Sequence, residues 1–593
     1  MKWRIIIFIG LIFLLFIIPW VNADEWYSND WNYRKQINVS NIYDENLTEY
    51  QIMYYVDTSS LISGGKLNSN CSDLRFTNNT GGLIPYYVDE NPRYDCNSTE
   101  TLVWLQTDYL ESGANTTFYM YYGNSGAESL SNITEVFTYS ELKPIYYTVG
   151  ENVYDGTIGV VAFDANINVT SSGGTPKSVI LQPGGTDTFT TSNYRLADQG
   201  ASYLSVTGAL LGGDSSTSVG AEFNPISWAS TEFIVPNPRG AFDIYFYSPF
   251  EAITINCYEA TTTAGNWGSV QDSASCSAGG ACSATTFVWK SGRSILCNST
   301  APFLMYVQIG SKSQFPVYPM TDDLWIISDS RVGNAIDGAY VQEYGSHTST
   351  VTSGTRTVAW QKSDSTGEDG SGYAWHINSS EISLGGVETT DGDGSENAAY
   401  SPEYELEKEY YFYKTVEYIA LAATRKGTNC TLYATGAYSD IEDVADDAND
   451  YPWPSKIDLG TGSDTDITDG GARVICNATA GGHWETAGGD ESTLFGRKSA
   501  RQYVWPSPDY ILGGEETQPS SDTCTCPGDG NNWEIDMADS CNIVDTCNLG
   551  TGNITFIGTG TTIFNATISC ANLEYPTTSQ TLNIGSNALI TIG

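Results

Sequence analysis

The feature that most restricts the fold is a two-residue alternation of apolar and polar side chains in many short runs. Examples are Gln51–Val56 and Thr117–Tyr122. Turns rich in Gly, Asn and Ser separate the runs, and no window of a dozen residues has the 3.6-residue period of an amphipathic helix. The pattern predicts an all-β protein made of tandem β-sandwich domains, with a C-terminal Cys-rich segment leading into a parallel β-solenoid.

A chain of 593 residues is too long for one compact core and predicts three or four domains. The expected division is a signal peptide over 1–23, a β-sandwich over 24–140, two copies of a β domain over 141–322 and 323–513, a linker over 514–522, a Cys-rich segment over 523–550 and the start of a solenoid over 551–593.

The first module contains an ordered series of motifs: Trp31–Lys35, Asp73–Thr77, Gly82–Tyr87, Val103–Leu105, Phe118–Asn124 and Val136–Phe137. In this order, over residues 25–138, they resemble the family called domain of unknown function 2341, found in exported archaeal and bacterial proteins. The resemblance implies a β-sandwich surface module, often likened to lectin-type jelly rolls, with no established activity. It supplies no catalytic residues.

Physical roles can be assigned to several residues of this module. Trp104 and Phe118 are expected to fill the core, and Arg75 to pair with Asp73 or with a neighbouring carbonyl. Tyr86 and Tyr87 have two interpretations, which are strand packing and stacking on the apolar face of a sugar.

Residues 141–513 contain an internal duplication whose matches are offset by 166 to 187 residues. The matching motifs are Asp155-Gly156 with Asp337-Gly338, Leu211–Gly213 with Leu384–Gly386, Tyr245–Tyr247 with Tyr411–Tyr413, Asn256-Cys257 with Asn429-Cys430, Cys297-Asn298 with Cys476-Asn477, and Val317–Pro319 with Val504–Pro506.

The 13 cysteines fall into local sets, as disulfides in an oxidising compartment tend to do. The repeat predicts equivalent staples, and the expected pairs are Cys71 with Cys96, Cys257 with Cys297, Cys276 with Cys282, and Cys430 with Cys476. Five cysteines remain and cannot all pair with one another: Cys524, Cys526, Cys541, Cys547 and Cys570.

After Gly550, short strands punctuated by Gly and Asn are typical of the stacked coils of a parallel β-solenoid. The chain stops at Gly593, directly after a strand and without a polar cap. We therefore expect either that this is the front part of a longer protein or that something else covers the last coil. The unpaired thirteenth cysteine fits truncation equally well.

The N-terminus has the pattern of an export signal. Lys2 and Arg4 precede a charge-free run, Ile5–Val21, and a small-residue cleavage site ends at Ala23. An uncleaved membrane anchor is the alternative, since the run is near the lower limit of a spanning length. If the signal is cleaved, we expect no membrane span in the mature chain and an extracellular or cell-surface location.

Asn-x-Ser/Thr sequons are dense, with seven before Glu135, and favour a surface glycoprotein. The acceptor residues are Asn38, Asn46, Asn70, Asn78, Asn97, Asn115, Asn132, Asn168, Asn298, Asn378, Asn429, Asn477, Asn553 and Asn565.

The charge composition excludes one class of partner. Lys and Arg number 26 against 70 Asp and Glu, which gives a formal net charge of −44. Only 16% of residues are charged, so the acidity reflects scarce basic residues more than abundant acids. Such a chain repels phosphate backbones, and we expect no nucleic-acid partner.

Catalytic and metal-binding motifs are few. His347, His376 and His483 lie far apart and are expected to be surface residues, and Cys524-x-Cys526 favours disulfides over zinc. Neither a Gly-x-Ser-x-Gly elbow nor a phosphate-binding loop occurs. Glu485 beside His483 is the least implausible carboxylate catalyst, and we expect no enzyme.

Calcium is the one cofactor that the sequence leaves open. Asp391, Asp393 and Glu396 place hard oxygen ligands on a Gly-containing loop, but Glu396 occupies the position where an EF-hand needs Gly. Solvated acidic loops are the competing interpretation of these residues.

Two classes of function fit these observations. The first is a non-enzymatic secreted or cell-surface glycoprotein with a structural or adhesive role, built from disulfide-stapled β domains. The second is a glycan-binding, lectin-like protein or the non-catalytic part of a carbohydrate-active enzyme. The expected partners are glycans or other envelope proteins.

Overall fold

The structure is a computed structural model of the whole chain. It describes residues 26–91, 93–140, 145–147, 157–162, 167–172, 176–182, 186–190, 195–201, 204–209, 220–235, 242–261, 267–289, 293–309, 314–328, 338–343, 350–352, 364–365, 373–378, 384–389, 397–399, 401–402, 406–413, 416–425, 427–436, 441–444, 456–459, 467–486, 492–493, 501–518, 524–574, 579–586 and 588–593.

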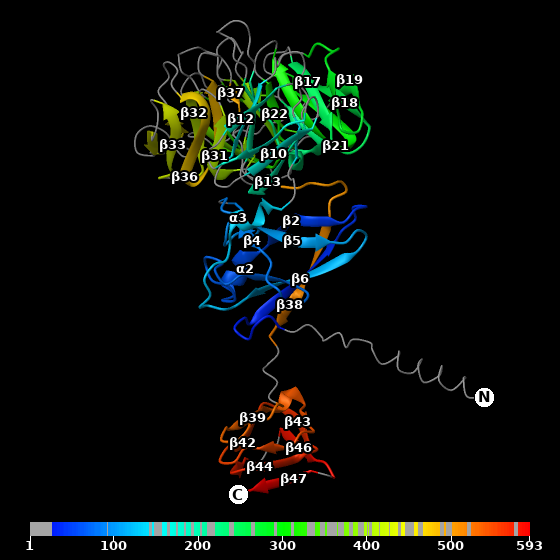
Figure 1. Cartoon of the computed structure of the whole chain (residues 1–593), viewed down its shortest axis with the longest axis vertical. Coiled ribbons are helices and arrows are strands. Elements are labelled where there is room, and N and C mark those ends of the chain that lie inside the picture. Colours follow the sequence, from blue (N-terminus) through cyan, green and yellow to red (C-terminus); the bar gives the residue numbers. More distant parts are fainter. Residues whose placement is uncertain are drawn as a thin grey trace, which may run out of the picture.

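The first module is a sandwich of two antiparallel sheets, with strand orders β3-β6-β1-β38 and β2-β5-β4 (Figure 1). Alternate side chains of each strand face inward, so Val103 and Leu105 of β5 are fully buried between the sheets. The elements are β1 (Tyr33–Ser40), β2 (Leu47–Val56), α2 (Thr58–Ser63), β3 (Arg75–Asn78), β4 (Tyr86–Val88), β5 (Thr101–Leu110), β6 (Asn115–Tyr122), α3 (Ile133–Val136) and β38 (Asp509–Thr517).

Strand β38 closes this sandwich from the far side of the chain. It pairs antiparallel with β1, from Ser40 opposite Asp509 to Tyr33 opposite Thr517. Figure 1 shows it as an orange strand among the blue strands of the first module. The chain thus leaves the sandwich, builds both repeat copies, and returns to complete the first sheet.

Side chains hold β38 in place. Tyr510 packs edge-on against Tyr54 in the core, with ring centroids 5.5 Å apart. Arg34 Nε donates to Glu516 Oε2 at 2.7 Å, which joins residues 482 positions apart. The expected linker over 514–522 is therefore wrong for its first four residues, which continue the strand.

A buried glutamine of the sandwich binds both the segment where the chain leaves for the repeat copies and the segment where it returns. Gln51 is fully buried, and its Nε2 donates to the carbonyls of Glu49 at 2.8 Å and Val136 at 3.0 Å. Its Oε1 accepts from Tyr139 Oη at 3.0 Å and from the backbone N–H of Gln502 at 3.3 Å. Tyr139 lies where the chain leaves the sandwich and Gln502 where it returns, so one side chain fixes both ends of the insertion.

Several of the family-like motifs meet at one end of the sandwich. Trp31 Nε1 donates to the carbonyl of Asp73 at 3.0 Å, and the Asp73 carboxylate accepts from the backbone N–H of Gly123 at 3.0 Å. Arg75 lies over the Trp31 ring and donates to the carbonyl of Glu128 at 2.7 Å, so carbonyls are its observed partners. Gly123 has φ +93°, and a Cβ there would lie 2.7 Å from the ring of the first residue of β1.

In the described residues, the entry strand β7 and the two repeat copies contain the strands β7 to β37. Copy 1 and its entry strand comprise β7 (Thr138–Tyr139), β8 (Ile145–Tyr147), β9 (Thr157–Ala162), β10 (Ile167–Ser172), β11 (Ser178–Leu181), β12 (Thr186–Thr190), β13 (Arg195–Ala201), β14 (Leu204–Ala209), β15 (Gly220–Glu222), β16 (Ser230–Val235), β17 (Phe242–Ser248), β18 (Ile253–Ala260), β19 (Trp267–Cys276), β20 (Gly280–Ala284), β21 (Ile295–Ile309) and β22 (Gln314–Val317). Copy 2 comprises β23 (Asp323–Ser328), β24 (Gly338–Glu343), β25 (Thr350–Thr352), β26 (Asp364–Ser365), β27 (Tyr373–Asn378), β28 (Leu384–Thr389), β29 (Asn397–Ala399), β30 (Ser401–Pro402), β31 (Glu407–Tyr413), β32 (Val416–Ala423), β33 (Asn429–Gly436), β34 (Ile441–Val444), β35 (Lys456–Leu459), β36 (Ile467–Thr486) and β37 (Ser492–Thr493).

The copies share one topology. Their seven-stranded sheets have the orders β19-β18-β21-β17-β20 and β34-β33-β36-β32-β35, and β16 and β22 pair β21 as β31 and β37 pair β36. The copies also contact each other reciprocally, because β9 and β14 touch β31 while β24 and β28 touch β16. One sequence match is wrong: Tyr245–Tyr247 lies in β17, whose counterpart is β32, whereas Tyr411–Tyr413 lies in β31.

Disulfides staple equivalent positions of the copies. Cys257 lies directly opposite Cys297 across β18 and β21, and Cys430 lies opposite Cys476 across β33 and β36; both pairs are bonded. Each closes a loop of 40 or 46 residues, which is worth about 4 kcal/mol by chain entropy.

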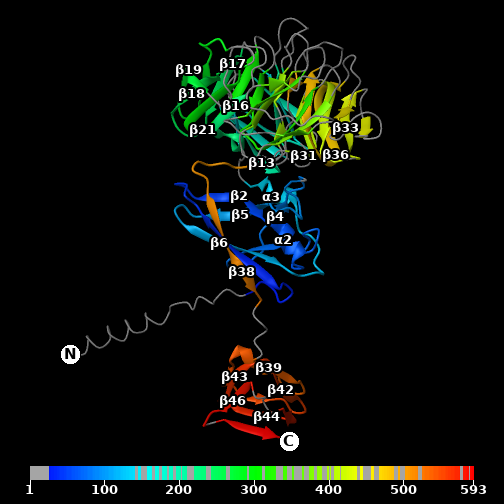
Figure 2. The ribbon, with the colours of Figure 1, turned by 180° about the vertical axis from the view of Figure 1, so that it is seen from behind.

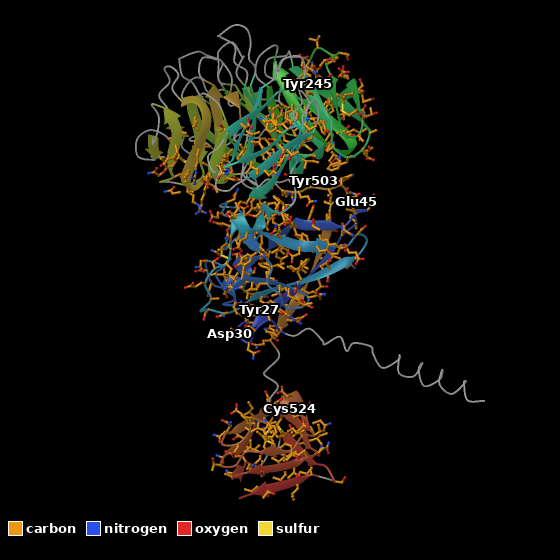
Figure 3. All side chains as sticks on the ribbon, viewed as in Figure 1. Tyr27, Asp30, Glu45, Tyr245, Tyr503 and Cys524 are labelled. Carbon is orange, nitrogen blue, oxygen red and sulfur yellow. A yellow bond between two sulfur atoms is a disulfide. The ribbon has the colours of Figure 1, made fainter. Side chains whose placement is uncertain are left out.

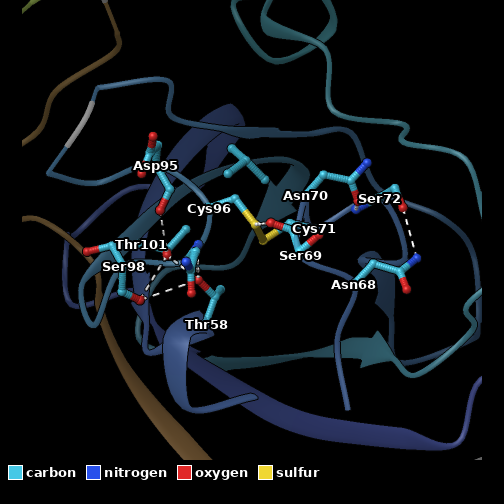
Figure 4. Close-up of a disulfide and its surroundings, with 12 residues drawn as sticks. Thr58, Asn68, Ser69, Asn70, Cys71, Ser72, Asp95, Cys96, Ser98 and Thr101 are labelled. Atoms are coloured by element: carbon cyan, nitrogen blue, oxygen red, sulfur yellow. Dashed lines mark hydrogen bonds between the residues drawn. A yellow bond between two sulfur atoms is a disulfide. The ribbon is translucent and has the colours of Figure 1, made fainter. Parts of the chain in front are cut away.

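The two other expected disulfides are also present. Cys276 bonds Cys282 across the turn between β19 and β20. In the sandwich, Cys71 bonds Cys96 beside the hydroxyl contact between Thr58 and Thr101 (Figure 4).

The C-terminal unit is a three-faced parallel β-solenoid with sheets β39-β42-β45, β40-β43-β46 and β41-β44-β47. Cys524–Cys541 and Cys526–Cys547 tie the segment before the first coil to that coil, and Cys570 is a buried free cysteine of the core. The strands are β39 (Trp533–Asp536), β40 (Asn542–Ile543), β41 (Cys547–Asn548), β42 (Asn553–Ile557), β43 (Gly560–Phe564), β44 (Thr567–Cys570), β45 (Asn572–Leu573), β46 (Gln580–Ile584) and β47 (Leu589–Ile592).

Figures 1 and 2 show the repeat copies at one end of the sandwich and the solenoid at the other. Within the described residues, no helix has the length and apolar character needed to cross a membrane.

Replacing Gln51 by Met tests the tie at the insertion point. Gln51→Met keeps the length of the side chain but takes a hydrogen-bond partner from two carbonyls, a hydroxyl and an N–H, so we expect a loss of about 2 to 4 kcal/mol. Gln106→Met is the matched control, because Gln106 lies partly exposed on β5 and donates to one carbonyl, that of Thr138. Chemical denaturation measures both, and equal losses would contradict a special role for Gln51.

Candidate functional site: the junction cavity

A cavity of about 450 Å³ lies between the sandwich and the repeat copies. Its size lies in the range of small-molecule sites, about 300 to 1,000 Å³. The sandwich, copy 1, copy 2 and the returning segment all line it, and Figure 3 labels Tyr503 of that segment at this junction. We call this site the junction cavity.

The sandwich wall of the cavity follows from strand alternation. Tyr86 of β4 points inward, is 2% exposed, and donates its hydroxyl to the carbonyl of Leu74 at 2.9 Å. Its neighbour Tyr87 therefore faces outward and lines the cavity. On β5, Val103 packs between the two sheets, while Trp104 lies on the other face of the strand. Trp104 is buried, as expected, but in a second, smaller core cluster that it forms with Val136 and Phe137.

Ion pairs hold the repeat copies over this face. Arg93 of the sandwich binds Asp322 through two nitrogens, at 2.6 and 2.8 Å, and both side chains are mostly buried. Bidentate geometry makes this pair stronger than an ordinary exposed one. Two further pairs cross the junction in the described part of the chain, Lys408 with Glu90 and Arg425 with Asp95.

Arg501 occupies an aromatic corner of the cavity. Its guanidinium lies 5.1 Å from the ring centroid of Trp104 and 6.0 Å from that of Tyr503. Cation–π contacts of this kind are worth about 0.5 to 2 kcal/mol and do not use the N–H donors. Tyr503 is in turn fixed against Phe250 of copy 1, with centroids 5.8 Å apart.

Asp89 is the carboxylate with the most perturbed environment in the cavity. Its pKa is raised to about 6, mainly by burial and to a smaller extent by the nearby charges of Glu407 and Glu90. Hydrogen bonds oppose this shift, since Oδ1 accepts from the backbone N–H of Asn91 at 2.9 Å and Oδ2 from Trp104 Nε1 at 3.3 Å. The protein thus holds a carboxylate where its charge is costly.

The remaining predicted site residues are widely spread. Asp391, Asp393 and Glu396 lie outside the described residues, as does His347. His376 of β27 is half-buried and stacks on Trp325 at 4.2 Å, which contradicts a plain surface position. His483 and Glu485 lie in β36, where only their backbone is described.

The sequons divide by exposure. Those with exposed acceptor residues are Asn46, Asn70, Asn97, Asn115, Asn132, Asn477 and Asn565, and those with partly buried ones are Asn38, Asn78, Asn168, Asn298, Asn429 and Asn553. Asn378 lies in β27, where only its backbone is described.

Sequence reasoning missed Asp89 and Arg501. They are 412 positions apart, and each stands in a segment without a recognisable motif. Only the return of the chain through β38 brings them to one cavity. The sequence did single out Tyr87 and Trp104. It could not show that they lie on the cavity side of the β2-β5-β4 sheet, because that depends on strand register.

Comparison with known proteins agrees with one part of this picture. Residues 70–142 match the family model of Domain of unknown function (DUF2341). The resemblance seen in the sequence is thus confirmed for this stretch, which contains β3 to β7 and the cavity residues Tyr87, Asp89 and Trp104. No curated protein and no solved structure matches the chain.

The DUF2341 region carries a testable pH dependence at Asp89. Its folded-state pKa of about 6 lies above the ordinary value of 3.8, so the folded protein binds this proton more tightly. The resulting stability is present at pH 4 and is lost as pH rises through 6. Asp89→Asn removes the charge, and we expect a gain of about 1 to 2 kcal/mol at pH 7.5 and almost none at pH 4.

Thermal unfolding of wild type and variant at both pH values measures this difference. Asp108→Asn is the control, because Asp108 is exposed on β5, and its effect should stay within about 0.5 kcal/mol at either pH. Destabilisation of the Asp89 variant at pH 7.5 would show that the ionised carboxylate contributes to folding instead.

Proposed function

We propose that this chain is a non-enzymatic, exported surface glycoprotein with a structural or adhesive role, in which the DUF2341 sandwich carries the repeat copies as a display unit. The observation that supports the proposal best is the position of the two chain exits. β1 begins at Tyr33 and β38 ends at Thr517, and these residues lie opposite each other. Both flanking segments therefore leave the sandwich at one end.

The repeat copies are attached at the other end. Ser40 lies opposite Asp509, where the returning chain enters β38, and Gln51 binds both crossing points of the insertion. The repeat copies therefore stand away from both flanking segments, as suits a unit whose task is to present a surface.

Covalent and surface chemistry supports the exported location. Six disulfides link twelve of the thirteen cysteines, and proteins that keep such bonds mature in oxidising compartments. Seven sequon asparagines are exposed and sterically suited to carry glycans. In this proposal the glycans and the net charge of −44 keep the displayed β surfaces from aggregating.

A count of free thiols tests the exported state. Protein isolated from its native host without reductant should gain one alkyl group per chain when it is denatured and treated with iodoacetamide, and thirteen after reduction. Cys570→Ser should remove the single label, since Cys570 is the free and buried cysteine.

Peptide mapping of the unreduced protein and labelling of intact cells with an impermeant amine reagent complete this test. Cys257 should be linked to Cys297, and the protein should be labelled on intact cells. Thirteen reactive thiols without reductant, or a Cys257–Cys276 link, would contradict the scheme.

A further inference from the structure

We propose that the junction cavity binds a neutral sugar residue, with Asp89 and Arg501 hydrogen-bonding its hydroxyl groups against the ring of Tyr87. This site goes beyond the display role and does not depend on it. The cavity is the meeting place of four parts of the chain, and its lining combines aromatic rings with a few charged groups.

The aromatic lining fits the apolar side of a sugar ring. Tyr55 and Tyr87 line the sandwich wall, and Trp228 of copy 1 lines the opposite wall. Trp228 is only 6% exposed and is held by Tyr318, whose ring centroid lies 4.5 Å away. The electron-rich faces of such rings attract the weakly positive C–H groups of a sugar.

The polar lining supplies both halves of hydroxyl recognition. Each oxygen of Asp89 accepts one protein hydrogen bond, so a carboxylate with about four acceptor positions keeps roughly two for a ligand. Arg501 has only ring contacts in the described part of the chain, which leaves its five N–H donors for a ligand. A sugar hydroxyl both donates and accepts, and matches this pair.

The pKa of Tyr55 indicates that Asp89 and Arg501 both lie near one part of the cavity wall. Burial raises the pKa of Tyr55 to about 12, while Arg501 lowers it and Asp89 raises it. Both charges therefore lie within electrostatic reach of one phenol on the cavity wall. A ligand that rests on this wall meets an acceptor and a donor together.

The balance of charge favours a neutral ligand over an ionic one. Two of the acidic lining residues already have basic partners, since Glu90 pairs with Lys408 and Glu409 pairs with Arg473. The carboxylate of Asp89 repels an anion, and the guanidinium of Arg501 repels a cation. Neutral polyols avoid both penalties.

Asp89 also bears the mark of a functional group. A chain selected only for stability would place an amide or an apolar side chain where the ionised form is disfavoured by burial and by Glu407. Perturbed groups in a cavity are the usual sign of a binding or reactive site. In the sugar proposal, this carboxylate accepts hydrogen bonds from the hydroxyl groups of the ligand.

The test is ligand-observed NMR on the full mature chain with four probes: the methyl glycosides of glucose, galactose, mannose and N-acetylglucosamine. At least one should bind, and Asp89→Asn and Tyr87→Ala should each weaken it about tenfold or more. The Asp89 variant is expected to fold more stably at neutral pH, so its loss of binding cannot come from unfolding.

Matched controls lie on the same sheet. Asp108→Asn and Tyr109→Ala change the same residue types at exposed positions of β5, away from the cavity lining, and should leave binding unchanged. No binding of any glycoside at about 10 mM, or binding that both cavity variants leave intact, would overturn the proposal.

Ionic probes decide the ligand class. Tetramethylammonium and glucuronate should bind at least tenfold more weakly than the best neutral glycoside. Preferential binding of either ion, lost in Asp89→Asn or Arg501→Gln, would overturn the assignment to a neutral sugar. If no sugar binds, the sugar proposal fails but the proposed display role does not, because that role is tested by the count of free thiols.

Discussion

The pairing of β38 with β1 is the constraint on which the rest of the structure depends. It obliges the chain to return to its first module after more than 360 residues, and so makes the repeat copies an insertion within a sandwich. Gln51 shows how closely the two crossings are held, because one buried amide satisfies a hydroxyl, an N–H and two carbonyls around them. Leaving such groups unpaired in a core is expensive.

The junction cavity is a consequence of that return. Since the copies are anchored at both ends, they rest on the outer face of the β2-β5-β4 sheet, and ion pairs such as Arg93 with Asp322 orient them there. Trp104 packs on Phe137 of the first module, and Tyr87 is half-buried beside it in the cavity wall. The repeat copies cover this face, so Asp89 and Arg501 line a cavity there.

Local features of this fold could be predicted from the sequence because their causes are local. Alternating runs identified the strands, short Gly- and Asn-punctuated repeats identified the solenoid coils, and the duplicated Cys257 and Cys430 identified equivalent staples. The closing strand could not be predicted in this way. Residues 514–517 are Gly, Glu, Glu and Thr and show no apolar alternation, so only their partners in β1 reveal them as a strand.

The cavity escaped prediction for the same reason. Trp104 is buried as expected, but alternation shows only that a strand has two faces, not which face meets the second sheet and which meets the cavity. Asp89 and Arg501 carry no motif, and their meeting depends on a pairing that joins distant segments. Contacts of high sequence separation leave no periodic trace in the residues that make them.

The most direct test of this account is to remove the repeat copies. Residues 141–500 would be replaced by a flexible linker of about six residues, which is long enough because Tyr139 and Gln502 bind the same oxygen of Gln51. Hydrogen exchange should then show protected amides in both β1 and β38 and one cooperative unfolding transition. A folded sandwich whose residues 509–517 exchange freely would contradict the claim that β38 closes it.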